Sequence, residues 1–279
     1  MDIKYCLNKI KKTIPALFVM ASLTGCRTES VQGLTVYAFS AGAADAFLIT
    51  TPGSAVLIDC GEKDDGADIS AYLKKQGISQ LDHLIITHFD KDHIGGAPAV
   101  LGSVTVKNVL QSDCPKDSKT YDRYMNALSD AGITAKTLTE DADISFELDG
   151  AAYDIDAPKG GYEDDESNNS SLIIKLTYEG NRLLFMGDAE DERVTEYLAD
   201  DTQPYDLLKV PHHGRSGENL EELFDIVKPK AAVITSSIDE PEDDEVVEML
   251  KERGAQVFLT RKSPVEATVT TEGIEVHYK

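Results

Sequence analysis

The chain has 279 residues, 41% of them apolar and 28% charged, and its 27 Lys and Arg against 50 Asp and Glu give a formal net charge of −23. These proportions are those of a globular protein that can bury a sizeable core, and they argue against wholesale disorder. A chain this acidic lacks the basic face that a sequence-reading nucleic-acid binder normally presents.

The amino-terminal segment has the composition of an export signal. Four lysines between Lys4 and Lys12 precede the apolar run 13–23 (TIPALFVMASL), which is too short to span a bilayer as a helix. The run ends in Leu23-Thr24-Gly25-Cys26, which resembles the lipoprotein signal of bacteria. We therefore expect residues 1–25 to be a lipoprotein signal peptide, Cys26 to carry the lipid and residues 26–33 to be a tether. The protein would then be exported and anchored to a bacterial membrane, facing outside the cytoplasm; a plain secreted protein or a buried amino-terminal helix is the alternative.

Residues 34–279 are expected to form one domain in which short strands alternate with helices. Apolar runs bounded by small and turn-forming residues predict strands over 34–39, 46–50, 55–59, 83–87, 104–110, 144–148, 151–156, 172–178, 182–187, 206–210, 231–235, 256–260, 265–270 and 273–278. Helical periodicity predicts helices over 67–76, 118–131, 190–200, 218–227 and 242–253. Two strand-rich halves, with helices between the later strands, indicate two packed sheets covered by helices.

Two of the six His residues lie in a polar segment that directly follows the predicted buried strand 83–87. The segment reads THFDKDHIGG (87–96), and its potential ligands are His88, Asp90, Asp92 and His93. Imidazole and carboxylate groups together suit Zn²⁺, Mn²⁺ or Fe²⁺, so this loop is a candidate metal site. The two glycines that end it are expected to let the backbone turn tightly into the next helix.

Two later segments have the same design. The sequence LLKVPHHGRS (207–216) places His212 and His213 after an apolar strand, and LLFMGDAEDE (183–192) places Asp188 after another. Ligand sites in sheet proteins commonly form at the carboxyl ends of strands. We therefore expect the three segments to meet in space.

At this point the chain resembles a known family. The pattern His-x-Asp-x-Asp-His-x-Gly-Gly of residues 88–96 resembles the signature of the metallo-β-lactamase superfamily. More narrowly, it is similar to the metallo-hydrolase domain of ComEC-type competence proteins, in which Asp takes the place of the second His. Other similar segments follow the same order in the chain: 39–49, 57–61, 168–172, 187–190 and 211–214. The resemblance covers nearly all of 34–279 and implies an α/β fold, a four-layer αββα sandwich.

The resemblance also implies a pair of divalent metal ions, Zn or Mn. It assigns His88 and Asp90 to one ion and Asp92 and His93 to the other. Asp188 would bridge the two ions, and His212 would complete the second site, with His213 as its alternate. Asp92, His93 and Asp188 are thus also the expected catalytic residues. Two cations about 3.5–4 Å apart lower the pKa of a shared water to about 7, so that a metal-bound hydroxide can attack the substrate.

Further residues are candidates for positioning or for substrate contact. Asp59, at its own strand end, is expected to accept a hydrogen bond from a ligating His and so to select its tautomer. Asn168 and Asn169 lie near the position where many relatives supply a further His. Their side chains either form hydrogen bonds or bind a metal through their amide oxygens, or the two residues are simply part of a loop turn. Lys209 lies beside the metal segments and is a candidate phosphate contact, as are Lys91 and Arg215. His83 and His277 are expected to be structural or exposed.

The function that follows is an extracytoplasmic metal-dependent hydrolase. The ComEC-like segments favour a phosphodiesterase or nuclease acting on DNA, including single strands, or on nucleotides. The charge of −23 opposes this substrate, because non-specific DNA binding depends on Lys and Arg that release counterions. A small-molecule metallohydrolase acting on a lactone, β-lactam or phosphocholine ester, and a non-catalytic binding lipoprotein, therefore remain alternatives. The sequence points to no protein partner.

Overall fold

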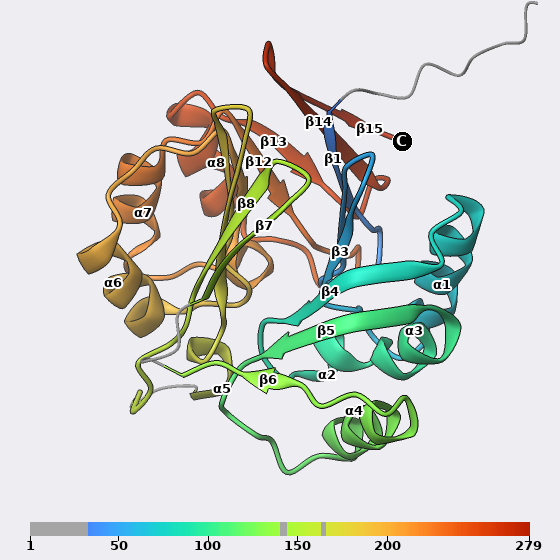
Figure 1. The fold of residues 1–279 in the computed structure, drawn as a ribbon. Helices are drawn as coiled ribbons and strands as arrows, with labels where there is room; N and C mark the ends of the chain where they lie inside the picture. The colour runs from blue at the N-terminus through green and yellow to red at the C-terminus, as the bar shows by residue number, and fades with distance from the viewer. Residues whose placement is uncertain (1–32, 140–143, 163–165) are drawn as a thin grey trace, which may run out of the picture. The chain divides into compact units, whose positions relative to one another are not determined.

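The structure is a computed structural model and describes residues 33–139, 144–162 and 166–279 (Figure 1). The expected signal peptide, the lipidated Cys26 and the tether up to residue 32 lie outside these residues. Within the described ranges, no helix is both long and apolar enough to cross a membrane.

The first sheet has eight strands in the described part of the chain, in the order β15-β14-β1-β2-β3-β4-β5-β6. Its strands are β1 (Leu34–Ala38), β2 (Phe47–Thr50), β3 (Ala55–Ile58), β4 (Gln80–Ile86), β5 (Thr105–Gln111), β6 (Lys136–Thr137), β14 (Val265–Thr270) and β15 (Gly273–Tyr278). The strands from β3 to β6 run parallel, and the others pair antiparallel.

The second sheet has seven strands among the described residues, in the order β13-β12-β11-β10-β9-β8-β7. Its strands are β7 (Ile144–Leu148), β8 (Ala151–Asp156), β9 (Ile173–Tyr178), β10 (Asn181–Phe185), β11 (Leu207–Lys209), β12 (Ala231–Ile234) and β13 (Gln256–Leu259). The strands from β10 to β13 run parallel, so their carboxyl ends share one edge.

Alternation along the strands explains why the sheets pack face to face. Phe47 and Ile49 of β2 belong to the core between the sheets, whereas Leu48 belongs to a second cluster on the outer face. In β10, Phe185 lies in the central core and Leu184 packs outward. Successive strand side chains point to opposite faces, so strands that are apolar at every position bury both. The rings of Phe47 and Phe185 meet across the two sheets with centroids 5.5 Å apart.

Helices cover the outer faces of both sheets (Figure 1). The first sheet is covered by α1 (Asp65–Lys75), α2 (Lys91–Ile94), α3 (Ala97–Ser103) and α4 (Lys119–Asp130). The second is covered by α6 (Asp191–Asp200), α7 (Leu220–Val227) and α8 (Asp244–Glu252). The predicted four-layer αββα sandwich is therefore confirmed. The helix expected after the two glycines is α3, although its bounds were not predicted. The short elements β6, α2, α5 (Glu166–Asn169) and the 3₁₀ turn η2 (Pro211–Gly214) were not predicted, because so few residues carry no periodic pattern. Cys60 and Cys114 are unpaired thiols.

His83 is a half-buried titratable group between the two sheets. Its ring stacks on Phe146 at a centroid distance of 4.1 Å, and its Nδ1 has no hydrogen-bond partner among the described residues. Burial lowers the pKa of His83 below its ordinary 6.5. The imidazole of His83 therefore binds a proton less readily in the folded state than in the unfolded chain. The neutral ring contributes its full stability at a pH above the pKa that His83 has in the unfolded chain. This stability is lost as the pH falls toward the lower pKa that His83 has in the folded state.

We expect His83→Phe to make the protein less acid-sensitive. Between about pH 7.5 and about pH 5.5, where an ordinary His titrates, the melting temperature should fall less in this variant than in the wild type. Thermal unfolding followed by circular dichroism at several pH values measures this. His277→Phe is the control, because that side chain is 51% exposed and should leave the pH dependence unchanged. Equal slopes for His83→Phe and the wild type would contradict the prediction.

Candidate active site

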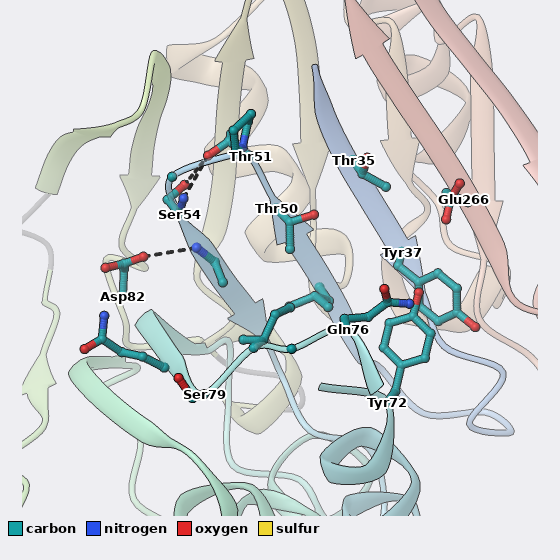
Figure 2. A pocket seen from close by; sticks show the side chains of 17 residues that line it. Thr35, Tyr37, Thr50, Thr51, Ser54, Tyr72, Gln76, Ser79, Asp82 and Glu266 are labelled. Atoms are coloured by element: carbon teal, nitrogen blue, oxygen red, sulfur yellow. Dashed lines mark hydrogen bonds between the residues drawn. The ribbon is translucent and has the colours of Figure 1, made fainter. Parts of the chain in front are cut away.

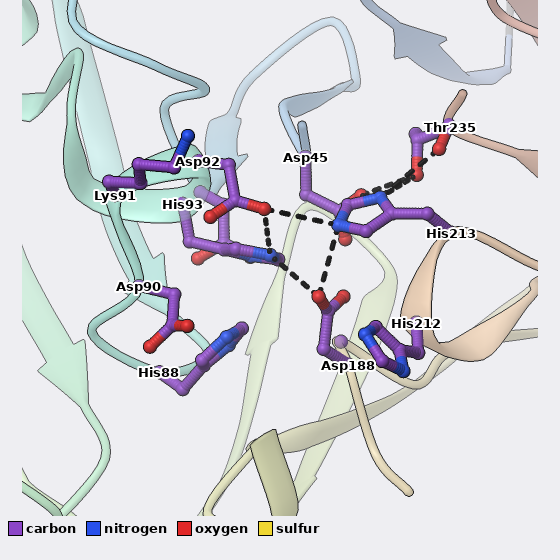
Figure 3. A network of polar contacts seen from close by, with 12 residues as sticks. Asp45, His88, Asp90, Lys91, Asp92, His93, Asp188, His212, His213 and Thr235 are labelled. Atoms are coloured by element: carbon purple, nitrogen blue, oxygen red, sulfur yellow. Dashed lines mark hydrogen bonds and ion pairs between the residues drawn. The ribbon is translucent and has the colours of Figure 1, made fainter. Parts of the chain in front are cut away.

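Three segments that are far apart in the sequence meet at one edge of the sandwich (Figure 3). β4 is followed by Thr87 and His88, β10 is followed closely by Asp188, and β11 is followed by η2. The first strand belongs to one sheet and the other two belong to the second sheet. The expected convergence of these strand ends is thus present, and the site lies between the two halves of the fold.

Two glycines allow the close packing around these loops. Gly187 has a φ of 53°, and a Cβ there would lie 3.0 Å from the Oγ of Ser171. Gly96 has an ordinary helical φ of −82°, but a Cβ there would lie 2.2 Å from the carbonyl oxygen of Cys60. Gly96 is therefore required for close backbone approach and not, as the sequence suggested, for a tight turn.

Four side chains form the centre of the site. The Oδ2 atom of Asp188 lies 3.2 Å from the Nε2 of His93 and 3.0 Å from the Nε2 of His213. The Oδ2 atom of Asp92 lies 3.3 Å from the same nitrogen of His213. One ligand atom from each of Asp92, His93, Asp188 and His213 lies within 4.8 Å of all the others.

The electrostatics of this group favour a cation. Burial alone lowers the pKa of a His, but the carboxylate of Asp188 raises the pKa of His213 to about 9 and that of His93 well above its usual range. The buried Nε2 atom of His88 has no hydrogen-bond partner in the described chain, and the Nε2 atoms of His93 and His213 face the carboxylate oxygens given above. Imidazole nitrogens together with two carboxylates are a set of ligands that binds Zn²⁺ or Mn²⁺. Asp92, His93, Asp188 and His213 therefore fit one divalent ion.

Asp59 holds His93 in the orientation that such an ion requires. Its Oδ2 lies 2.8 Å from the Nδ1 of His93, and its two oxygens also accept hydrogen bonds from the Oγ1 and the backbone N–H of Thr87. A carboxylate at Nδ1 keeps the proton there and leaves the lone pair of Nε2 for a metal. The sequence assigned this position to Asp59.

The structure exchanges the roles of His212 and His213. His213 enters the central group, and its Nδ1 lies 2.9 Å from the Oγ1 of Thr235. The side chain of His212 is 32% exposed and its Nδ1 lies 3.1 Å from Glu190. Both residues have left-handed backbones, with φ of 45° and 53°, so the two rings leave the turn in different directions. The structure thus brings His213, the alternate, into the central group, and places His212 outside it.

Lys209 is a buried structural cation, not a substrate contact. Its Nζ lies 2.6 Å from the Oδ2 of Asp45, donates to the carbonyl of Gly187 at 2.6 Å, and lies 3.2 Å from the Oδ1 of Asp188. Its side chain is 1% exposed, so a substrate phosphate cannot reach it. Lys209 instead fixes the carboxylate of Asp188. Asp45 was not singled out from the sequence, although it lies inside the similar segment 39–49.

The two asparagines hold the loop against α6. The Oδ1 of Asn169 accepts hydrogen bonds from the backbone N–H groups of Glu190 and Arg193, both at 3.1 Å, at the start of that helix. The Nδ2 of Asn168 donates to Glu190 at 2.9 Å. Helix-capping bonds of this kind satisfy amides that the helix itself leaves unpaired. The amide oxygen of Asn169 is therefore already hydrogen-bonded to the helix.

The remaining predicted residues lie beside the central group. His88 is fully buried, and burial together with the neighbouring His93 lowers its pKa to about 3, so the ring is neutral. The Oδ1 of Asp90 accepts hydrogen bonds from the ammonium of Lys116 and the hydroxyl of Ser167. Lys116 was missed, because a single lysine in a polar loop gives no sequence signal. The other two candidate phosphate contacts bind elsewhere: Lys91 pairs with Glu62, and Arg215 donates to the carbonyl of Pro241.

The family model of the metallo-beta-lactamase superfamily matches residues 40–236, which contain all of these side chains. The chain belongs to the metallo-beta-lactamase superfamily. Members of this superfamily are metal-dependent hydrolases. The resemblance found in the sequence is therefore confirmed, and the chain has the donor residues that one metal ion needs.

Within the superfamily, two curated relatives are proteins of the type that the sequence suggested. ComE operon protein 3 of Bacillus subtilis is 31% identical over 170 residues, which are 59% of this chain and 21% of that protein. Recombination protein 2 of Haemophilus influenzae is 27% identical over 197 residues, which are 68% of this chain and 23% of that protein. The chain thus spans less than a quarter of the length of these relatives. Ribonuclease Z of Clostridium beijerinckii is 39% identical over a shorter stretch of 59 residues, which are 21% of this chain and 18% of that protein.

Solved structures of the superfamily support the fold. The metallo-beta-lactamase fold protein YhfI from Bacillus subtilis superposes with a TM-score of 0.57 at 10% identity, covering 88% of this chain and 100% of that one. A variant of the CmlA beta-hydroxylase superposes with a TM-score of 0.54 at 16% identity, covering 81% and 52% of the two chains. At these identities the likeness concerns the fold alone.

A cavity of about 560 Å³ lies on the outer face of the first sheet (Figure 2). Its lining includes Tyr37 and Tyr72, whose rings stack at 4.2 Å, and the carboxylates of Asp82 and Glu266. It reaches Gln80 at the start of β4, the opposite end of that strand from His88. None of the donors of the central group lines it, so this cavity is separate from the central group.

We expect Asp59→Asn to weaken divalent-ion binding about 10–100-fold, the usual effect of losing a carboxylate behind a ligating His. Asp59 has a φ of 54°, a conformation that Asn also tolerates, so the backbone should keep its shape. Competition with a fluorescent chelator measures the affinity. Asp149→Asn is the matched control, since Asp149 also has a positive φ, of 50°, and bonds only to the distant Gly53. An affinity equal to that of the wild type would rule out the positioning role of Asp59.

Proposed function

We propose that this chain is an extracytoplasmic metal-dependent phosphodiesterase, acting on DNA or nucleotides. One observation carries the proposal: Asp92, His93, Asp188 and His213 converge, and the Nε2 atoms of the two histidines lie 3.0–3.3 Å from carboxylate oxygens of the two aspartates. The phosphodiester as substrate is supported by the similarity to ComEC-type relatives and by the shorter similarity to a protein named as a ribonuclease.

The residues around the ion have separate tasks. A bound divalent ion supplies a Lewis acid that polarises a substrate oxygen and makes water more acidic. Asp59 fixes the tautomer of His93, and Lys209 holds the carboxylate of Asp188 in place. Lys116 brings a positive charge to the mouth of the site, where its side chain is 40% exposed. A phosphate oxygen is the kind of group that an ammonium donor binds there.

The acidity of the whole chain limits how the substrate is captured. With a net charge of −23, the surface as a whole repels a polyanion, so attraction must come from the ion and the few cations near it. Short oligonucleotides or nucleotides meet less of this repulsion than long duplexes do. We therefore propose that short oligonucleotides and nucleotides are better substrates than long duplexes.

We also propose that the protein is exported and carried on a lipid at Cys26, on the strength of the sequence 1–26 alone. The test is metabolic labelling of the full chain with a radioactive fatty acid in a bacterial host. Label should be incorporated into the wild type and lost in Cys26→Ser. Label retained in that variant would overturn the proposed anchor.

The activity itself is tested with purified protein loaded with Mn²⁺ or Zn²⁺. Bis-(p-nitrophenyl) phosphate, single-stranded DNA and the β-lactam nitrocefin are compared under the same conditions. We expect cleavage of the first two substrates and none of nitrocefin. Preferential hydrolysis of nitrocefin would overturn the phosphodiesterase and favour a small-molecule hydrolase, and cleavage of none would favour a binding protein.

A further inference from the structure

We propose that the ammonium of Lys116 takes the place of a second metal ion, so that this chain binds a single divalent ion. The inference rests on the metal-dependent activity proposed above, and it concerns a residue that the sequence did not single out. It departs from the pair of ions that the family resemblance implies. Four observations support it: the number of donors, the partners of Asp90, the hydrogen bonds of Asn169 and the position of Lys116.

The donors are unevenly divided between the two expected ion positions. Asp92, His93, Asp188 and His213 lie within 4.8 Å of one another and make a complete set for one ion. In the described part of the chain, His88 and Asp90 belong to no group of three or more His, Cys, Asp or Glu donors this close together. A protein-bound Zn²⁺ ion normally has three or four protein ligands. The other group of three donors, Asp45, Asp59 and His93, shares His93 with the first group, and its carboxylates already bind Lys209, Thr87 and His93. The described residues therefore do not fit a second ion at His88 and Asp90.

Asp90 already has partners where that ion would have to bind. Its Oδ1 accepts hydrogen bonds from both the Nζ of Lys116 and the Oγ of Ser167. Ser167 lies on α5, and Lys116 lies in the loop between β5 and α4, so two separate segments hold this carboxylate. An ammonium bonded to a carboxylate neutralises it and repels a cation brought to the same oxygen. The pair Lys116–Asp90 thus supplies the charge that a metal would otherwise provide.

The residue that replaces the family's further His does not restore the missing ligand. Asn169 uses its amide oxygen to accept two backbone N–H groups of α6. Turning that oxygen toward an ion would leave both amides of the helix without a partner, which is costly in a buried position, and Asn169 is 1% exposed. The amide oxygen of Asn169 therefore stays bound to the start of α6.

Lys116 is placed to act on an anionic substrate. Its ammonium has three N–H donors, of which Asp90 and Ser167 take two. Its side chain is 40% exposed, so the remaining donor can reach a phosphate oxygen at the mouth of the site. Lys116 then stabilises negative charge beside the single ion, which is the task of the second metal in binuclear sites.

Metal stoichiometry tests the inference without relying on activity. The full chain is stripped with a chelator, titrated calorimetrically with Mn²⁺ and separately with Zn²⁺, and analysed for bound metal. We expect one ion per chain in the wild type. Asp92→Asn should lose that ion, whereas Asp90→Asn, the matched substitution two residues away, should keep it with nearly the same affinity. Two ions in the wild type, or loss of an ion in Asp90→Asn, would overturn the inference.

Lys116 variants test the role of the ammonium. In Lys116→Met we expect kcat/KM for bis-(p-nitrophenyl) phosphate to fall about a hundredfold, as when one preorganised donor is removed. The variant should still bind the ion, and Lys116→Arg should recover part of the rate. Unchanged turnover in Lys116→Met would exclude the catalytic charge. A wild type that binds no ion would refute the proposed function itself, and this result differs from the binding of two ions.

Discussion

Replacing His213 with Asn should lower divalent-ion affinity by at least about a hundredfold and kcat/KM by about a thousandfold, in the range seen when one electrostatic catalytic group is lost. The Nε2 of His213 is one of the four donors, lying 3.0 Å from Asp188 and 3.3 Å from Asp92. Without it, one nitrogen ligand is missing, and the two carboxylates face each other with less compensation. Calorimetric titration with Zn²⁺ or Mn²⁺ and steady-state kinetics measure the two effects.

His212→Asn is the control for this experiment. The two residues are adjacent, and both have left-handed backbones in which Asn is among the least strained residues. The ring of His212 contacts Glu190 and not the central group, so we expect affinity and kcat/KM to change less than about tenfold, within the effect of one exposed ion pair. A larger loss in His212→Asn than in His213→Asn would return the ligand role to His212.

Lys209→Met should destabilise the protein by about 3–5 kcal/mol, the cost of removing one partner from a buried ion pair. The Lys209 ammonium lies between the carboxylates of Asp45 and Asp188, and all three side chains are less than 5% exposed. Although burial alone would lower it, these carboxylates raise the pKa of Lys209, so the amine is charged in the native state. Met has a similar length and no charge, so it removes the ammonium partner from two buried carboxylates. Urea unfolding in the presence of a chelator measures the free-energy difference.

Lys230→Met serves as the comparison. Lys230 also pairs with a carboxylate, the Oδ1 of Asp206 at 2.7 Å, but its side chain is 73% exposed. Exposed ion pairs contribute at most about 1 kcal/mol, so this variant should unfold close to the wild type. Similar losses in the two lysine variants would mean that the Lys209 pair contributes no more than a surface pair.

The fold was largely predictable because its signals are local. Strands such as 46–50 and 182–187 are apolar at successive positions, and buried sheets require that pattern. The donors of the first loop were also predictable, since they lie within six residues after one strand. Asp59 could be assigned because it ends a neighbouring strand of the same parallel pair.

The errors concern choices that depend on distant contacts. His212 and His213 are chemically identical neighbours, and the ring that faces inward is distinguished by distant contacts such as that between His213 and Thr235, 22 residues away. Lys209 was a candidate for positioning or for phosphate contact, and the sequence could not choose between these roles because its partner Asp45 lies far away in the chain. Lys116 reaches Asp90 across 26 residues of sequence with no motif around it. Pairings of this kind appear only after the sandwich has formed.

The division of the donors between the two halves has a thermodynamic consequence. Asp92 and His93 follow β4 in one sheet, whereas Asp188 and His213 follow β10 and β11 in the other. An ion held by all four is a cross-link between the layers, and it is absent from the unfolded chain. At a free concentration 100 times its dissociation constant, such an ion would add about 2.7 kcal/mol to the apparent stability, and a chelator would remove the same amount. Metal supply would then decide how firmly the two layers stay joined, as well as whether the protein is active.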